Sequence, residues 1–180
     1  MSSLTTTAPI PLPHADQYEA VCEIYNVHRI LRMNALYYGN KLWWLQRWNL
    51  IFEIAIAVST SATVGSLALM KSAVPYLAAT AAILGVIKPI LAIPARIERL
   101  SKLWADYISL SLETGRIVNR MQSCQCIEPG MAKAMEDVQN RYDELQKRDD
   151  PYPNTRLLMK QKKAVDREIP ATGLWAPCAT

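Results

Sequence analysis

Two charged residues in an almost uncharged stretch are the most restrictive chemical feature of this sequence. Residues 49–95 contain only three charged positions, whereas about a quarter of an ordinary globular chain is charged. A charge at the centre of a bilayer costs about 2.5 to 3.5 kcal/mol, so such residues usually pair or reach water. If 50–70 and 73–95 form an antiparallel hairpin, the depths of Glu53 and Lys88 in the membrane differ by no more than about 6 Å. We expect them to form an intramembrane charge pair; snorkelling of both to the headgroups is the alternative.

Hydroxyl and small side chains form stripes in the same segments. Hydroxyls suited to a wetted surface fall on one helix face at spacings of four and three: Ser59, Thr63 and Ser66. Small residues recur at every fourth position, which permits close helix contact: Ala57, Ser61 and Gly65 in 50–70, and Ala81 with Gly85 in 73–95. These stripes either pack the hairpin against itself or form contacts between copies, with the hydroxyls facing a pore.

Catalytic and metal-binding patterns are missing from the sequence. Four cysteines, Cys22, Cys124, Cys126 and Cys178, lack the paired spacing of a zinc site, so we expect reduced thiols without metal. No serine has the setting of a nucleophile elbow, and the carboxylates are interspersed with Lys and Arg, as on solvated helix faces. We therefore predict that the protein is not an enzyme and has no catalytic residue, bound metal or cofactor.

The elements that must position these residues are two apolar segments, 50–70 and 73–95. Fourteen of 21 residues in the first and seventeen of 23 in the second are apolar. At about 1.5 Å per residue, each is long enough to cross a hydrocarbon core of about 30 Å. Because two residues separate them, they are expected to form an antiparallel transmembrane hairpin in a lipid bilayer. A hairpin buried inside a soluble protein is the alternative.

The residues that flank the hairpin predict its orientation. Six basic residues lie within twenty positions of its outer ends, against only Lys71 in the turn: Arg32, Lys41, Arg47, Arg96, Arg99 and Lys102. Four of the five tryptophans lie at the same expected interface, where this residue type is enriched: Trp43, Trp44, Trp48 and Trp104. The positive-inside rule then predicts a multi-pass protein of the inner cell membrane with both termini in the cytoplasm.

Three amphipathic helices are expected outside the membrane, over about 16–48, 96–124 and 130–148. Apolar residues alternate at spacings of three and four along each, which is the pattern of a coiled-coil seam. The first seam is Val21, Ile24, His28, Leu31, Ala35, Tyr38, Leu42 and Leu45; the second is Leu100, Leu103, Tyr107, Leu110, Thr114, Ile117, Met121 and Cys124; the third is Met131, Met135, Val138, Tyr142 and Leu145. These helices should pack into a bundle, either within one chain or between protomers. His28 is either a packed seam residue or a pH sensor.

The two ends of the chain differ from these segments in composition. Residues 1–15 are rich in Ser, Thr and Pro and are expected to be a disordered leader. Residues 151–180 contain prolines and a basic run, so we expect a mostly extended tail with one short helical stretch. This tail is either simply solvated or contacts anionic headgroups or a partner. Within the second apolar segment, Pro89 is expected to kink the helix at Gly85.

The layout of residues 18–122 resembles the SLATT family of two-transmembrane effectors. The resemblance lies in the proline-free helix that runs through 21–47 into the first apolar segment, the minimal turn, the second apolar segment and the helix over 96–121. It implies a membrane effector of prokaryotic conflict systems, one that forms pores or damages the membrane when a partner senses infection. The family offers no catalytic residues to transfer to this chain.

The sequence therefore predicts an all-α membrane protein, with a transmembrane hairpin extended by a cytosolic helical bundle. Because one hairpin cannot surround water, we expect a homo-oligomer that forms a pore or disrupts the membrane. The resemblance implies that it acts in antiviral (antiphage) defence or cell suicide. By resemblance, a separate sensor or second-messenger-producing protein would activate it, and no specific nucleic-acid binding is expected. The alternative is a passive membrane adaptor whose bundle recruits a cytosolic partner.

Overall fold

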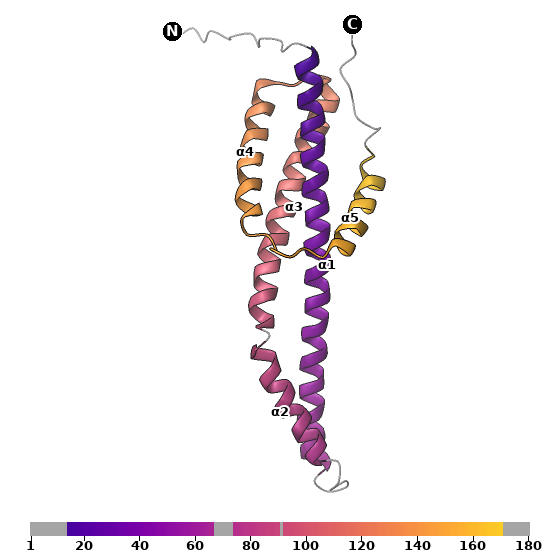
Figure 1. Cartoon of the computed structure of the whole chain (residues 1–180), viewed down its shortest axis with the longest axis vertical. Coiled ribbons are helices and arrows are strands. Elements are labelled where there is room, and N and C mark those ends of the chain that lie inside the picture. Colours follow the sequence, from indigo (N-terminus) through magenta and orange to yellow (C-terminus); the bar gives the residue numbers. More distant parts are fainter. Residues whose placement is uncertain (1–13, 67–73, 91, 171–180) are drawn as a thin grey trace, which may run out of the picture. The chain divides into compact units, whose positions relative to one another are not determined.

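The computed structural model describes residues 14–66, 74–90 and 92–170, in which every regular element is an α-helix (Figure 1). The helices are α1 (His14–Ser66), α2 (Val74–Ile90), α3 (Ile93–Cys124), α4 (Pro129–Gln146) and α5 (Thr155–Glu168). The predicted all-α class is confirmed. Of the expected leader 1–15, residues 1–13 lie outside the described residues, and the last two positions begin α1.

The chain divides into two compact units. Unit 1 comprises Met1–Tyr37 and Leu103–Thr180, and unit 2 comprises Tyr38–Lys102. Helices α1 and α3 each contribute residues to both units. The described parts of unit 1 therefore contain the beginning of α1, most of α3, and all of α4 and α5, whereas unit 2 contains the rest of α1, α2 and the beginning of α3.

The core of unit 1 is built from the three predicted seams. The most deeply buried side chains come from all of its helices, with α1 contributing Val21 and Leu31, α3 contributing Tyr107, Leu110, Thr114 and Met121, α4 contributing Val138, and α5 contributing Val165. The expected burial is confirmed at most of the predicted seam positions. His28, Leu45, Leu100 and Met135 are only half-buried, and Cys124 is exposed. Apolar residues at alternating spacings of three and four bury one face of each helix, which is why these helices pack together.

Cross-helix contacts show that neighbouring helices of unit 1 are antiparallel. On α1 and α3, the Gln122 amide donates to the Tyr25 hydroxyl, and further along the pair His28 lies against Gly115. In the α3–α4 pair, Arg141 forms an ion pair with Glu113 at 2.6 Å, and Arg148 pairs with Asp106. In each pair, residue numbers increase along one helix while those of the contacting residues on the other helix decrease, so the two helices run in opposite directions. The short connection between α3 and α4 accounts for their antiparallel packing.

Two of the buried polar side chains of this core, Thr114 and Tyr107, have hydrogen-bond partners within the bundle. The buried Thr114 hydroxyl donates to the Leu110 carbonyl at 2.7 Å, a bond that the helical spacing of four residues provides. The hydroxyl of the fully buried Tyr107 donates to Asp149 Oδ1 at 2.7 Å, and its ring meets that of Tyr142 edge to face at 6.5 Å. These bonds avoid the cost of burying an unpaired polar group, about 1 to 3 kcal/mol each.

The helical stretch expected within the tail 151–180 is present, and at 14 residues it is the main element of the described part of the tail. Helix α5 occupies Thr155–Glu168 and buries Gln161 and Val165. Its start is capped by Asn154, whose side chain accepts a hydrogen bond from the Leu157 N–H at 3.1 Å, as in many helices. The basic composition of this segment concealed one apolar face at helical spacing. Residues 171–180 lie outside the described residues.

The second apolar segment, 73–95, does not form one continuous helix, because α2 and α3 are separated within it. Helix α2 passes through Gly85 and Pro89 and ends at Ile90, and α3 starts at Ile93. Between them Ala92 has φ of 45°, a left-handed conformation that is uncommon for residues other than glycine. Pro94 explains the break, because its ring would clash with the carbonyl four residues earlier in a continuous helix. This interruption before Pro94 was not expected from the sequence; α2 itself is one helix through Gly85, and the kink there stays a prediction.

The expected membrane spans are not confirmed by the described residues. None of the helices in the described ranges has both the length and the apolar character that a membrane crossing requires. Parts of both expected segments, at 67–70, 73 and 91, lie outside the described residues.

We predict that truncation of the most buried seam residue of α1 destabilises unit 1. Leu31 is fully buried, so Leu31→Ala leaves a cavity and should lower the free energy of unfolding by about 2 to 5 kcal/mol. Leu112→Ala on α3, where the side chain is 60% exposed, is the control and should change it by less than about 0.5 kcal/mol. Urea unfolding of the full chain, followed by circular dichroism, measures both. Equal effects of the two variants would contradict the proposed core.

Candidate functional site

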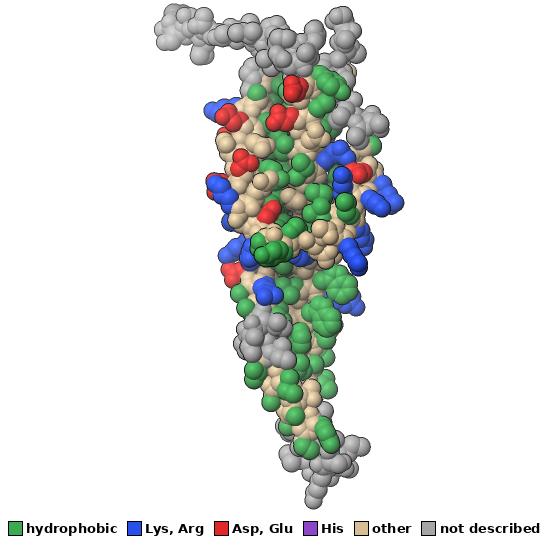
Figure 2. Space-filling view, viewed as in Figure 1, with side chains coloured by type: hydrophobic (Ala, Val, Ile, Leu, Met, Phe, Trp, Pro, Cys, Tyr) green, Lys and Arg blue, Asp and Glu red, His purple; other side chains and the backbone are tan. Residues whose placement is uncertain are grey.

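The most distinctive surface of the described structure is an exposed apolar stripe in unit 2. We call it the apolar stripe; its side chains are between 46% and 77% exposed. Its members on α1 are Trp43, Trp44, Trp48, Leu50, Ile51, Ile54 and Val58, and its members on α2 are Tyr76, Ile83 and Val86. On the face shown in Figure 2, these parts of α1 and α2 present mainly green and tan atoms, whereas blue and red side chains gather over α4 and α5.

Helical geometry explains why the stripe on α1 is continuous. At about 3.6 residues per turn, its seven α1 members fall within an arc of roughly 160°. The buried residues Tyr38 and Leu42 lie on the opposite side of the helix. One face of α1 therefore continues the buried seam, while the other presents large apolar side chains that no described part of the chain covers.

The predicted interface tryptophans occupy exposed positions. Trp43, Trp44 and Trp48 begin the apolar stripe, whereas Trp104 is exposed in unit 1. The Trp43 and Trp44 rings meet edge to face at 5.2 Å, and the Arg47 guanidinium lies 5.1 Å from the centroid of the Trp43 ring. A cation held over an indole ring is stabilised by about 0.5 to 1 kcal/mol at an exposed site. This end of the stripe thus combines apolar rings with a positive charge.

The predicted Glu53–Lys88 pair is not tested, because the side chain of Lys88 lies outside the described residues. Glu53 is exposed, and its Oε1 accepts a hydrogen bond from Asn49 Nδ2 at 2.9 Å. The sequence reasoning missed this bond, although the spacing of four residues between an amide and a carboxylate could have indicated it. Pairing of Glu53 with Lys88 stays a prediction.

The small and hydroxyl residues of the two stripes are only partly described. Side chains outside the description are those of Ser59, Thr63, Gly65, Ser66 and Ala81. Ala57 and Ser61 are exposed, and a Cβ built on Gly85 would have no other atom within 4 Å. These three positions are therefore not buried between described helices. Contacts between copies at these positions stay a prediction.

His28 lies where α1, α3 and α5 meet, in unit 1. Its ring packs against Gly115, where an added Cβ would lie 3.2 Å from His28 Cε1. The buried Nδ1 has no hydrogen-bond partner among the described residues. Burial lowers the pKa of His28 below its ordinary value and the Arg32 charge lowers it further, while Glu168 and a hydrogen bond to the Ser111 backbone act in the opposite direction. The neutral imidazole is thus favoured, as in a packed seam residue.

Helix α5 is attached to α1 beside this histidine. Arg32 binds Glu168 through two hydrogen bonds, at 2.8 and 3.2 Å, and Arg29 pairs with Asp166. At the other end of α5, the Tyr37 hydroxyl accepts a hydrogen bond from the Asn154 N–H at 2.9 Å. The sequence reasoning missed this docking; the signal was the pair of acidic residues at the end of a basic segment.

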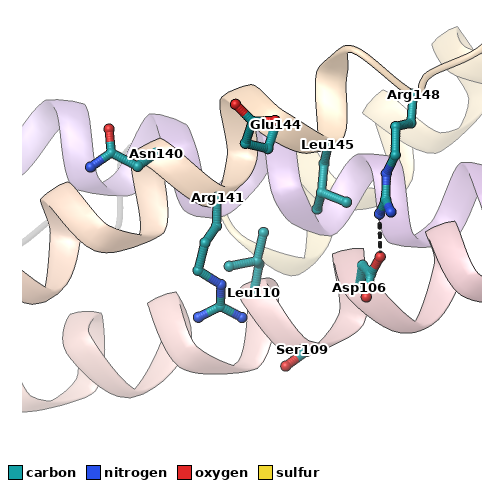
Figure 3. A pocket seen from close by; sticks show the side chains of 8 residues that line it. All are labelled: Asp106, Ser109, Leu110, Asn140, Arg141, Glu144, Leu145 and Arg148. Atoms are coloured by element: carbon teal, nitrogen blue, oxygen red, sulfur yellow. Dashed lines mark hydrogen bonds and ion pairs between the residues drawn. The ribbon is translucent and has the colours of Figure 1, made fainter.

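A groove between α3 and α4 is one of the hollow surfaces of unit 1 (Figure 3). It has a volume of about 460 Å³, with Leu110 and Leu145 among its apolar lining residues and Asp106 and Arg148 forming an ion pair across it. The lining contains no cysteine or histidine, and Arg141 is held by Glu113. The groove therefore offers apolar contact and hydrogen bonds to a ligand but no evident nucleophile with its base.

The structure brings three metal-ligating side chains together, although the sequence analysis expected Cys124 and Cys126 to be reduced thiols without metal. Cys124, Cys126 and Glu128 meet at the turn between α3 and α4. No described cluster combines these residue types with a histidine.

Comparison with protein-family models, curated proteins and solved structures finds no match to this chain.

The position of His28 predicts how stability depends on pH. Because its folded pKa is lowered, the unfolded chain takes up a proton more readily, and stability is lost as the pH falls through the unfolded value of about 6.5 and toward the folded one. The melting temperature of the parent should therefore drop more between about pH 7.5 and pH 5 than that of His28→Gln. His14→Gln, which changes the other histidine of the chain, serves as the control and should behave like the parent. Parallel pH profiles for the parent and His28→Gln would refute this role.

Proposed function

We propose that this protein is a membrane effector whose unit 2 enters the lipid bilayer and which acts as an oligomer. The observation that carries the proposal is the apolar stripe. Each large apolar side chain that moves from water into an apolar environment gains about 1.5 to 3 kcal/mol. A contiguous exposed apolar surface of this kind usually marks a site for a membrane or a protein partner.

Three features favour lipid as the environment of this surface. Tryptophans and Arg47 stand at its beginning, as is typical of the membrane–water interface. Beyond them, Glu53 is the only charged residue from 50 to 66. In the sequence, the apolar composition continues through 67–70 and from 73 into α2. The proposed arrangement is an antiparallel transmembrane hairpin in the inner cell membrane, with both termini in the cytoplasm.

Membrane damage requires several copies in this proposal. Two helices are too few to enclose water, so a conducting path needs a homo-oligomer. Ser59, Thr63 and Ser66 would supply the hydroxyls of that path, and Gly65 would permit close helix contact. The SLATT-like layout supports the same function and suggests that a separate sensor, or the messenger that such a protein makes, triggers opening.

A second function is favoured by the groove between α3 and α4. Its apolar floor and charged rim would suit a helix or peptide of a cytosolic partner. In that case the chain is a membrane adaptor, and unit 2 only anchors it. The two functions differ in one measurable property, because an adaptor leaves a membrane tight to ions.

The first prediction from this proposal concerns membrane binding. Ile54 and Val58 are 54% and 59% exposed in unit 2, so Ile54→Asp/Val58→Asp should abolish co-sedimentation of the full chain with vesicles, because charges are costly in lipid. Leu112→Asp, at an exposed apolar position of unit 1, is the matched control and should leave binding unchanged. If the double variant binds vesicles like the parent, unit 2 is not the membrane-associating part.

The second prediction separates assembly from conduction. Gly65→Leu should prevent oligomers in lipid nanodiscs, because a bulky side chain blocks close helix contact. Ser66→Leu should leave the oligomer intact but reduce dye release from vesicles, because an apolar side chain in place of a hydroxyl makes the pore lining less hydrated. Membrane potential is measured in parallel in cells that co-express the chain with its neighbouring genes, where the proposal places the sensor that activates it. An activated parent that leaves vesicles and membrane potential intact would replace the pore by the adaptor.

A further inference from the structure

The turn between α3 and α4 holds a cluster of metal-ligating atoms that the proposed membrane function does not use. The Sγ atoms of Cys124 and Cys126 and a carboxylate oxygen of Glu128 all lie within 4.8 Å of one another. We propose that these three residues form a binding site for a thiophilic divalent metal ion of the zinc class. The site lies within unit 1, so its test is independent of the membrane function.

The backbone of the turn explains how two cysteines in a Cys-X-Cys sequence converge. Residues two apart on a helix point to different sides, so Cys124 and Cys126 could not share a ligand within a continuous helix. Helix α3 ends at Cys124, and Gln125 then has φ of 51°. This left-handed residue bends the chain at the point between the two cysteines, which brings both sulfur atoms to one side.

Glu128 contributes the third ligand because its side chain is not used for helix capping. It is the N-cap residue of α4, but it makes no side-chain capping hydrogen bond. Its carboxylate instead accepts a hydrogen bond from Arg120 at 2.7 Å. Its Oε1 lies 3.9 Å from Cys124 Sγ, whose thiol donates to the Arg120 carbonyl at 2.9 Å. The carboxylate is therefore directed toward the end of α3 and toward the cysteines.

The chemistry of the cluster selects the class of metal. Two thiolates and one carboxylate carry three negative charges, which a divalent ion would offset. Zinc accepts both cysteine sulfur and carboxylate oxygen, and three protein ligands leave its fourth position open to water or another ligand. Magnesium and calcium prefer sites made of oxygen atoms. The mixed sulfur and oxygen set therefore favours zinc and related ions.

Electrostatics around Cys126 agree with this geometry. Loss of hydration raises the pKa of the Cys126 thiol, the neighbouring Cys124 and Glu128 raise it further, and Arg120 lowers it. The acidic groups thus repel one another when they ionise together, and a bound cation would relieve that repulsion. Since a metal ion binds the thiolates, its affinity should rise with pH.

Metal titration of the full chain tests the site. The metal-free protein, kept reduced with a phosphine, is titrated with Co²⁺, whose thiolate complexes absorb through sulfur-to-metal charge transfer, and Zn²⁺ is then used to displace it. We expect one Co²⁺ per chain with that absorption, its loss in Cys124→Ser and in Cys126→Ser, and at least about tenfold weaker binding in Glu128→Gln. Circular dichroism checks that each variant keeps its helices.

Matched cysteine variants decide which thiols bind. Cys22→Ser/Cys178→Ser removes the other two cysteines of the chain and should bind Co²⁺ like the parent. The proposal is overturned if Cys124→Ser/Cys126→Ser binds Co²⁺ as the parent does, or if the parent complex lacks thiolate charge transfer.

Arg120 provides a test that depends on this particular geometry. Its guanidinium competes with the metal for Glu128, so Arg120→Ala should strengthen Co²⁺ binding by up to about fivefold, which corresponds to the loss of one exposed ion pair. Arg116→Ala, at an exposed position one turn earlier on α3, is the matched control and should leave affinity unchanged. Weaker binding in Arg120→Ala than in Arg116→Ala would contradict a role for Glu128 as a ligand.

Discussion

Burial of the heptad seam on α1 is the constraint on which unit 1 depends. Val21 and Leu31 are buried together with the seam of α3, Val138 of α4 and Val165 of α5, so all four helices of unit 1 share one apolar core. Most of the stability of such helices comes from the packing of an apolar face, because isolated helices are marginal in water. The buried Thr114 hydroxyl is tolerated in this core because it donates a hydrogen bond to the Leu110 carbonyl.

The ion pairs between helices contribute little to the stability of the bundle but influence how the helices are aligned. The ion pairs of Arg32 with Glu168 and of Arg141 with Glu113 involve side chains that are partly exposed, and such pairs contribute only about 0 to 1 kcal/mol each. They cannot replace the apolar core as the source of stability. Their positions are specific, however, so they help set the register of α5 on α1 and of α4 on α3.

In unit 2, unlike in unit 1, large apolar side chains of α1 are exposed rather than buried. One face of α1 remains apolar and exposed there over several turns, and the described residues supply nothing to cover it. The membrane proposal and the metal proposal therefore rest on different evidence. The first rests on an apolar surface that needs a nonaqueous or protein environment, and the second on three ligand atoms that converge within one turn of unit 1.

The sequence by itself determined the all-α class and most of the seam positions, because the spacing of apolar residues along a helix is a local property. Tertiary structure decided the docking of α5, since the partners of Asp166 and Glu168 lie on α1. It likewise decided the convergence of Cys124 and Cys126, because that depends on the left-handed backbone of Gln125. Such distant contacts and single backbone angles have no periodic signal in the sequence.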